Sequence, residues 1–383
     1  MRKNDSPLRK RNLYWLIFLL AVVIALLFLI PTRGRENFPQ SEIPVFLDFS
    51  GESGQANPAY YPEGELESGQ SFVLRDESGG ALDETSIMVY ADDEFILENN
   101  DMYRVVSVDW EGRAAVCEKT GRAELPYLEA WDQPPVTKGN YVPKIGIYMT
   151  HTDESYVPTE GTASKTGRGG ILKVGSRFAE ILKSKGLDAV LSQNKHDPHD
   201  GNAYSRSRRT AVQLLKSNPD VLFDVHRDGV PDPGFYATTL DGEKGTKIRL
   251  VVGKQNPAMA SNLEFAKQIK SYYDKHEPGL IKGIYMAKGN YNQDIGPRVL
   301  LLEVGTHTNT REEAEKGIEV FAGGLPQFLG AGARNGGQGQ KTPLNTNKGI
   351  QTAILWLVGA AAVGGAAFIW ISKGAGGGSG RSS

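Results

Sequence analysis

The stretch from residue 144 to residue 191 decides the fold. It opens with Lys144-Ile-Gly-Ile-Tyr-Met149, continues with Ile171-Leu-Lys-Val-Gly-Ser-Arg-Phe-Ala-Glu-Ile-Leu182 and closes with Ala189-Val-Leu191. The first and last runs are short and apolar, as buried strands are. In the middle run, Ile171, Val174 and Phe178 recur at helical spacing, and Gly186 follows as a helix end. This β-α-β order predicts an α/β layer fold.

The same alternation continues downstream. We expect helices at 204–216, 262–276 and 311–321, and strands at 221–225, 247–252, 284–286 and 299–302. The prediction for residues 141–330 is therefore one domain: an open, mostly parallel sheet with helices on both faces. The breakers in the preceding stretch, residues 133–140, indicate a domain boundary, so we expect this domain to fold by itself.

The sequence before that boundary has a different character. Between 71 and 132, short β-branched or aromatic runs lie at 72–74, 86–90, 94–97, 103–108 and 113–117, separated by turn residues. They predict a small all-β module. The single cysteine, Cys117, lies in the last run and is interpreted as a buried small side chain, since it has no disulfide partner in the chain. Residues 32–70 are rich in Gly, Pro, Ser and Glu and are predicted to be a linker.

Near its start the chain carries a run typical of a membrane anchor. Leu13 to Ile30 is an uncharged apolar run of 18 residues, about 27 Å long as a helix, so we place a transmembrane anchor at 13–31. The preceding tail, 1–12, should be cytoplasmic because basic residues dominate it: Arg2, Lys3, Arg9, Lys10 and Arg11. A cleaved signal peptide is the alternative, but no small-x-small cleavage site follows the run.

A second candidate span lies near the other end. Residues 349–372 carry no charge, with Trp356 and Trp370 near the ends of the run, and they follow a predicted linker at 331–348. The tail, 373–383, is basic. Two spans would leave the intervening domains on the extracytoplasmic side of the cell membrane. The alternative is an Ala/Gly-rich segment that packs on a partner or lies on the membrane.

Composition bounds the function. The chain has 383 residues, 43 Lys plus Arg against 45 Asp plus Glu, and a net charge of -2. This length allows two or three domains and excludes a disulfide-stapled miniprotein. The balanced charge argues against nucleic acid as a partner.

Three predicted strands end in residues with metal or acid-base chemistry. His151 follows the first strand, His226 closes the strand at 221–225, and Glu303 closes the strand at 299–302. Ligands of open α/β sheets bind at the carboxyl ends of the strands, so these side chains should converge. A catalytic zinc takes three protein ligands, and Glu154, three residues after His151, is the nearest third donor.

Other interpretations of these residues remain open. A histidine at a strand end is commonly a hydrogen-bonded loop residue, and a buried glutamate can be a structural ion-pair partner. His196 and His199 have a metal-like composition, but the Asp-Pro between them makes a turn in which their side chains need not converge. His307 lies close enough to Glu303 in sequence to contact a ligand or substrate.

Five motifs in this region resemble the stage II sporulation protein P family. They are His151-Thr-Asp-Glu-Ser-Tyr156, Tyr204-Ser-Arg-Ser-Arg208, Asp224-Val-His-Arg-Asp228, Asn290-Tyr-Asn-Gln-Asp294 and Leu302-Glu-Val-Gly-Thr-His-Thr-Asn-Thr310. The resemblance covers about residues 144–330. It implies a zinc N-acetylmuramoyl-L-alanine amidase with an α/β sandwich fold, which acts on peptidoglycan during engulfment of the forespore, and a peptide-cleaving activity is also attributed to the family.

The resemblance also implies residue roles. His151 and His226 would bind Zn²⁺, Glu303 would be the catalytic glutamate, and we place the third ligand at Glu154. The expected partners are peptidoglycan, the membrane and other wall-remodelling proteins.

Further residues of the same motifs and of the adjoining loop have side chains suited to the substrate. Arg227 and Arg298 suit peptide carboxylates, and neutral donors suit sugar or peptide amides: Asn290, Tyr291, Asn292 and Gln293.

Two other functions fit the same residues. A zinc endopeptidase that cuts stem-peptide cross-links would use the same groups on another amide. A non-catalytic wall-binding scaffold would need neither the two histidines nor Glu303.

Overall fold

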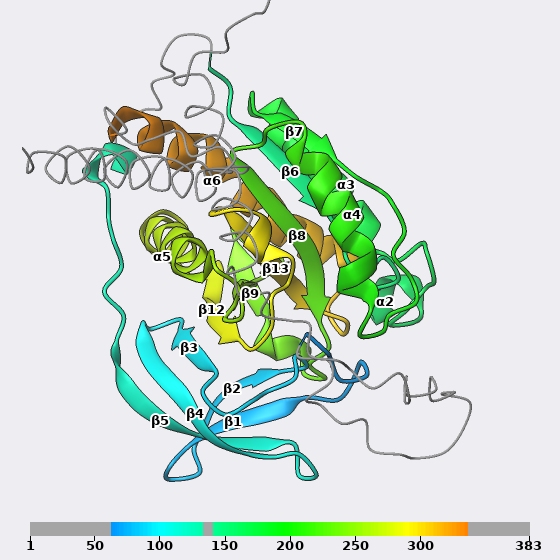
Figure 1. Cartoon of the computed structure of the whole chain (residues 1–383), viewed down its shortest axis with the longest axis vertical. Helices are drawn as coiled ribbons and strands as arrows, with labels where there is room; N and C mark the ends of the chain where they lie inside the picture. The colour runs from blue at the N-terminus through cyan, green and yellow to red at the C-terminus, as the bar shows by residue number, and fades with distance from the viewer. Residues whose placement is uncertain (1–62, 133–140, 336–383) are drawn as a thin grey trace, which may run out of the picture. The chain divides into compact units, whose positions relative to one another are not determined.

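The computed structural model describes residues 63–132 and 141–335 (Figure 1). Eleven strands form one sheet in the order β2-β1-β5-β4-β3-β12-β11-β13-β8-β6-β7. Their bounds are β1 (Phe72–Asp76), β2 (Ala81–Thr85), β3 (Glu94–Leu97), β4 (Asp101–Asp109), β5 (Ala114–Arg122), β6 (Lys144–Tyr148), β7 (Asp188–Leu191), β8 (Val221–Asp228), β11 (Ile248–Gly253), β12 (Ile281–Ala287) and β13 (Val299–Thr306). A small hairpin, β9 (Ala237–Leu240) with β10 (Glu243–Thr246), is separate.

From β12 to β7 every pair of neighbouring strands is parallel except β11 with β13. The predicted α/β class with a large, mostly parallel sheet is therefore confirmed for this part of the chain. The central strands β8 and β13 are buried at every position, because both faces of the sheet are covered here.

The helices are α2 (Val157–Glu160), α3 (Ile171–Ser184), α4 (Ala203–Leu215), α5 (Met259–His276) and α6 (Arg311–Asn335). Apolar side chains of α3, α5 and α6 share one core with alternate residues of the sheet, among them Phe178, Phe223 and Leu302. Leu214 of α4 packs with Tyr148 and Leu222, whose side chains leave the other face of the sheet. Helices therefore lie on both faces, as the sequence predicted.

The stretch predicted as a small all-β module does form strands, and these strands continue the main sheet. β3 pairs antiparallel with β12, with Leu97 opposite Gly283. A second core contains Phe95 and Val105 of this stretch together with Val251 and Tyr285 of the α/β part. Cys117 is fully buried in the same core, as expected. The module and the α/β part thus share both a strand edge and a core.

Buried charges reinforce this junction. Arg249 of β11 is 1% exposed. Its guanidinium lies 2.7 Å from Asp83 of β2 and 3.1 Å from Asp228 of β8. A buried cation without partners would cost several kcal/mol, so both carboxylates are needed at this position.

One predicted strand is replaced by a different pairing. The apolar run 86–90 lies after β2 and forms no strand of the main sheet. Its Ile87 instead bridges antiparallel to Glu65. The run is extended and buried, as its pattern indicated, but its partner is a segment that the sequence assigned to the linker.

Within the described ranges no helix is both long and apolar enough to cross a bilayer. The two predicted spans, 13–31 and 349–372, and the tails beyond them lie outside the described residues.

Candidate metal centre

Three parallel strands bring the predicted site residues to one edge of the sheet. Neighbours β6, β8 and β13 all run in the same direction, and Glu303 lies opposite His226 in the register of β13 and β8. His151 lies three residues after the end of β6. The structure thus brings His151, His226 and Glu303 together, because the carboxyl ends of parallel strands meet at one edge.

Four side chains at this edge offer metal-ligand atoms within 4.8 Å of one another: Glu65, His151, Glu154 and His226. Glu154 Oε1 lies 3.1 Å from His151 Nδ1 and 3.2 Å from His226 Nδ1, and Glu65 Oε1 lies 3.3 Å from His151 Nδ1. Ligand atoms about 2.0–2.1 Å from a tetrahedral zinc would lie about 3.3 Å apart. Both the donor types and their separations therefore fit zinc.

Nearby charge and hydrogen bonds hold Glu154 in the ionised form that binds a metal, against the effect of burial. Its side chain is fully buried. Burial opposes ionisation, but the nearby charge of His226 and hydrogen bonds from His151 and His226 outweigh it and lower the pKa of Glu154 to about 2. The other oxygen, Oε2, accepts a 2.9 Å hydrogen bond from the backbone N–H of Arg227, which fixes the carboxylate.

A carboxylate that the sequence analysis did not single out lies behind His226. Asp224 Oδ1 lies 3.1 Å from His226 Nε2, on the side of the ring opposite Glu154. Asp224 also accepts hydrogen bonds from the backbone N–H and the hydroxyl of Thr150. Metal-binding histidines usually direct their second nitrogen to such an acceptor. Period-two spacing on one strand was the available signal, because Asp224 and His226 share a face of β8.

Glu303 is buried without a hydrogen-bond partner for either carboxylate oxygen among the described residues. Burial, and then the negative charges of Asp228 and Glu65, raise the pKa of Glu303 well above its usual value. A carboxyl that holds a proton readily, next to a metal-ligand cluster, is suited to proton transfer.

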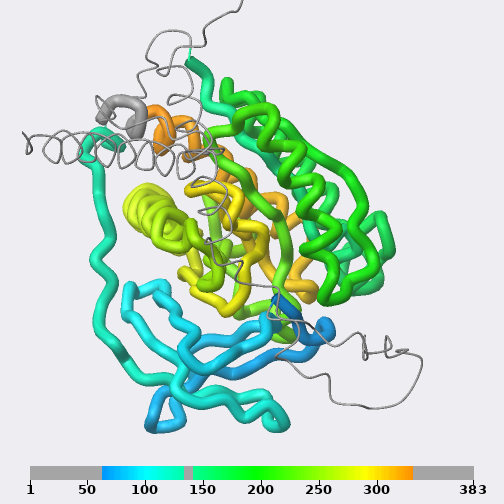
Figure 2. Tube along the Cα trace, in the orientation of Figure 1, coloured from blue at the N-terminus to red at the C-terminus, as the bar shows by residue number. Residues whose placement is uncertain are grey.

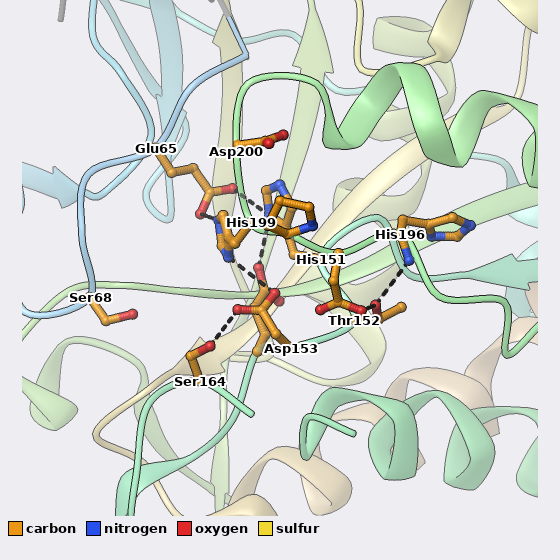
Figure 3. A network of polar contacts seen from close by, with 12 residues as sticks. Glu65, Ser68, His151, Thr152, Asp153, Ser164, His196, His199 and Asp200 are labelled. Atoms are coloured by element: carbon orange, nitrogen blue, oxygen red, sulfur yellow. Dashed lines mark hydrogen bonds and ion pairs between the residues drawn. The ribbon is translucent and has the colours of Figure 1, made fainter. Parts of the chain in front are cut away.

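Glu65 is the donor that the sequence analysis missed. Its side chain is 5% exposed, and Figure 3 shows its carboxylate directed at His151 and His199. It belongs to residues 63–70, predicted as the end of the 32–70 linker. No sequence pattern distinguishes it, because Glu63 and Glu67 flank it at equal spacing in a stretch without periodicity.

His196 and His199 are engaged separately, as the turn between them suggested. The ring nitrogens of His196 lie 2.8 Å from the Met149 carbonyl and 2.8 Å from the Thr210 hydroxyl. His199 stacks on His151 with ring centroids 3.7 Å apart and stands between two carboxylates, Glu65 and Asp153 (Figure 3). Burial opposes its protonation, but these carboxylates raise the pKa of His199 to about 10, so it is cationic.

Most of the predicted substrate-contact residues are held by the fold. Arg227 is 2% exposed and its guanidinium donates to the Ser68 hydroxyl and the Ala163 carbonyl. Asn292 donates to the Tyr204 carbonyl and the Ser207 hydroxyl. Gln293 bonds the backbone of Val251 and Gly253, and the ring of Tyr291 packs against that of Tyr204.

Of the remaining two predicted contacts, Arg298 lies apart from the metal-ligand group and Asn290 contacts Glu63. Arg298 precedes β13, so it lies roughly 16 Å along the strand from Glu303, and its guanidinium lies over the ring of Phe265. Asn290 contributes its backbone N–H to Glu63 at 2.8 Å. His307 is 6% exposed and its ring lies next to the Thr306 hydroxyl.

Comparison of the sequence with known proteins finds one matching family and a relative in that family. The family model described as Stage II sporulation protein P matches residues 90–325, and the Stage II sporulation protein P of Bacillus subtilis (strain 168) is 27% identical over 284 residues, covering 67% of this chain and 69% of that protein.

Two solved structures are weakly similar to this chain. One is the CwlD amidase from Clostridioides difficile in complex with the GerS lipoprotein, with 13% identity, 49% of this chain and 98% of that chain covered, and a TM-score of 0.34. The other is the N-acetylmuramoyl-L-alanine amidase AmiC2 of Nostoc punctiforme, with 16% identity, 49% and 97% covered, and a TM-score of 0.31. The family match alone spans more than half of the 383 residues and includes β3 to most of α6. The chain belongs to the stage II sporulation protein P family.

Proposed function

We propose that this chain is a zinc-dependent N-acetylmuramoyl-L-alanine amidase that cleaves the bond between the lactyl group of muramic acid and the stem peptide, in sporulation-type wall remodelling. The observation that carries the proposal is the juxtaposition of three zinc-type donors, His151, Glu154 and His226, with a buried glutamate that has no hydrogen-bond partner among the described residues, Glu303. Family membership supports the choice of peptidoglycan as substrate.

The three proposed zinc ligands come from two neighbouring parts of the sheet. His151 and Glu154 come from the loop after β6, and His226 comes from β8, so the ligand set is fixed by two neighbouring parallel strands. Asp224 orients His226, and the backbone of Arg227 orients Glu154. When bound, a zinc ion here supplies an activated water molecule and polarises the scissile carbonyl.

Glu303 would carry the proton in both halves of the reaction. It accepts the proton of the attacking water and delivers it to the departing alanine nitrogen, because an amide nitrogen leaves poorly without protonation. A raised pKa suits both transfers, since the carboxyl must take a proton and then keep it until the C–N bond breaks.

The predicted anchors extend the proposal to the cell membrane, with the described part of the chain on the extracytoplasmic side. The uncharged runs at 13–30 and 349–372 and the basic residues beside them support this location. The hydrolase proposal does not depend on it, since it rests on the geometry of the site.

Mass spectrometry of peptidoglycan digested by the purified full chain tests the bond assignment. We expect intact stem peptides with a free alanine amino group, released from glycan strands that retain their lactyl groups. Cleaved cross-links with stem peptides still attached to the glycan would show that the chain is an endopeptidase and not an amidase. Binding to peptidoglycan without any product would show that it is a non-catalytic scaffold.

A further inference from the structure

A short segment at the start of the described chain lies across the metal-ligand group. We call Glu63–Gln70 the strap. Its backbone pairs with the run after β2, through Leu66 N–H to the Ser86 carbonyl at 2.8 Å and Met88 N–H to the Gly64 carbonyl at 3.0 Å. Further along, Gly69 N–H donates to the carbonyl of Gly229, just beyond β8, at 2.9 Å. Figure 2 shows this blue start of the chain meeting the green end of β8.

Side chains fasten the strap to three parts of the α/β domain. Glu63 accepts the Asn290 N–H at 2.8 Å, and the Ser68 hydroxyl accepts from Arg227 at 2.9 Å. Between these two points Glu65 reaches the metal-ligand group. The strap is thus held by hydrogen bonds at both ends and by the ion pairs of Glu65 between them, with Leu66 as its apolar contact to the second core.

The position of the Glu65 carboxylate is specific. Oε1 lies 3.3 Å from His151 Nδ1, within the metal-ligand group, while Oε2 lies 3.6 Å from His199 Nε2 (Figure 3). A catalytic zinc has three protein ligands and keeps its fourth position for water or substrate. His151, Glu154 and His226 would provide three, so Glu65 would stand in the position that turnover requires.

The reaction itself generates the same chemical group at the same place. Hydrolysis forms a C–O bond from the water oxygen to the acyl carbon and breaks the C–N bond, and the nitrogen takes up a proton. The acyl fragment leaves as a carboxylate. The side chain of Glu65 places a carboxylate beside the metal-ligand residues His151, Glu154 and His226. In this respect it resembles the carboxylate of the acyl product.

We propose that the strap is an intramolecular occupant of the substrate site, in which Glu65 takes the place of the acyl carboxylate and holds the enzyme at a low basal rate until the strap is displaced. This inference rests on the proposed zinc hydrolase function. The burial of the site accords with this, because with the strap in place His151 is 3% exposed, His226 0% and Glu303 1%. Residues 67–69 are exposed, so an activating partner or substrate has an edge to engage.

A spectroscopic binding experiment tests the inference on the full chain. Zinc is replaced by Co²⁺, and acetohydroxamate, which chelates an open metal position, is titrated while the visible absorption of the metal is recorded. We expect Glu65→Ala to bind acetohydroxamate at least tenfold more tightly than the unsubstituted chain. Glu67→Ala, a change to an exposed glutamate of the same strap, should bind it like the unsubstituted chain. The rate of peptidoglycan release should rise at least tenfold in Glu65→Ala.

Zinc content separates the possible failures. If Glu65→Ala keeps one zinc but gains neither acetohydroxamate affinity nor rate, the strap does not occlude the site. If it loses its zinc, Glu65 is a permanent ligand, and the inference is equally overturned. If neither chain binds zinc or releases peptides, the proposed function fails instead. Glu65→Gln, which keeps the side-chain shape without its charge, gives the same decision should Glu65→Ala not fold.

Discussion

Asp224 lies next to the proposed zinc ligand His226 and should strengthen zinc binding. It faces the second nitrogen of His226 and is itself fixed by two hydrogen bonds from Thr150. In Asp224→Asn the shape is kept but the charge is lost, so we expect zinc affinity to fall roughly 10–100-fold. The zinc affinity is measured by competition with a chromophoric chelator. Asp220→Asn is the matched control, since Asp220 accepts the Lys144 N–H at the other end of β8, and equal losses in both variants would remove Asp224 from the site.

His307 predicts a pH dependence of stability. Burial and the charge of Arg227 lower the pKa of His307 to about 4, whereas an unfolded histidine has about 6.5. The unfolded chain therefore binds more protons between these values, so stability present above pH 6.5 is lost as the pH falls toward 4. From pH 7.5 to pH 5 this contribution is up to about 2 kcal/mol. Urea unfolding at both pH values should show a smaller loss for His307→Gln than for the unsubstituted chain, and parallel losses would contradict the assignment.

The pairing of β3 with β12 depends on the absence of a side chain at Gly283. Its φ is +155°, and an added Cβ would lie 2.4 Å from the carbonyl oxygen of Ile96. Gly121 of β5 has a φ of +150° but open space around the same position. Gly283→Ala should therefore destabilise the chain by about 1–3 kcal/mol more than Gly121→Ala, since only the former adds a clash to the backbone strain. Thermal unfolding compares them, and equal effects would mean that β3 is not held closely on β12.

The elements around the site differ in how far their sequence predicts them. β6, β8 and β13 each contain a short apolar run that is followed closely by His151, His226 or Glu303, so both their strand character and their convergence follow from the pattern. The pairing of β3 with β12 could not be predicted, because neither sequence run carries a pattern that identifies a pairing partner far away in the chain. The strap is a further case: its contacts come from backbone groups and from the side chains of Glu63, Glu65, Leu66 and Ser68, none of which periodicity distinguishes. Asn292 and Gln293 were predicted as substrate contacts because their sequence does not show that they are buried. In the structure their side-chain amides form hydrogen bonds with the backbone of Tyr204 and Gly253.

For the molecule as a whole, the shared core makes the domain boundary at 133–140 a matter for experiment. A fragment of residues 141–335 would expose the edge of β12, the apolar side chains of Val251 and Tyr285, and an Arg249 without Asp83. An open apolar edge strand favours association between chains. We therefore expect this fragment to aggregate or unfold at a lower temperature than residues 63–335, by size-exclusion chromatography and thermal melting. A monomeric fragment of equal stability would restore the independent domain that the sequence predicted.

The central claim is that one metal centre and one glutamate perform a single hydrolysis, and paired measurement of zinc content and peptide release in Glu303→Gln and His226→Ala tests it most directly. Glu303→Gln should retain one zinc while its rate falls by roughly 10² to 10⁴, because the amide cannot accept the proton of water. His226→Ala should lose zinc and activity together, since only one imidazole, His151, would then remain beside the carboxylates of Glu154 and Glu65. Near-normal turnover by Glu303→Gln, or full zinc occupancy in His226→Ala, would contradict the account.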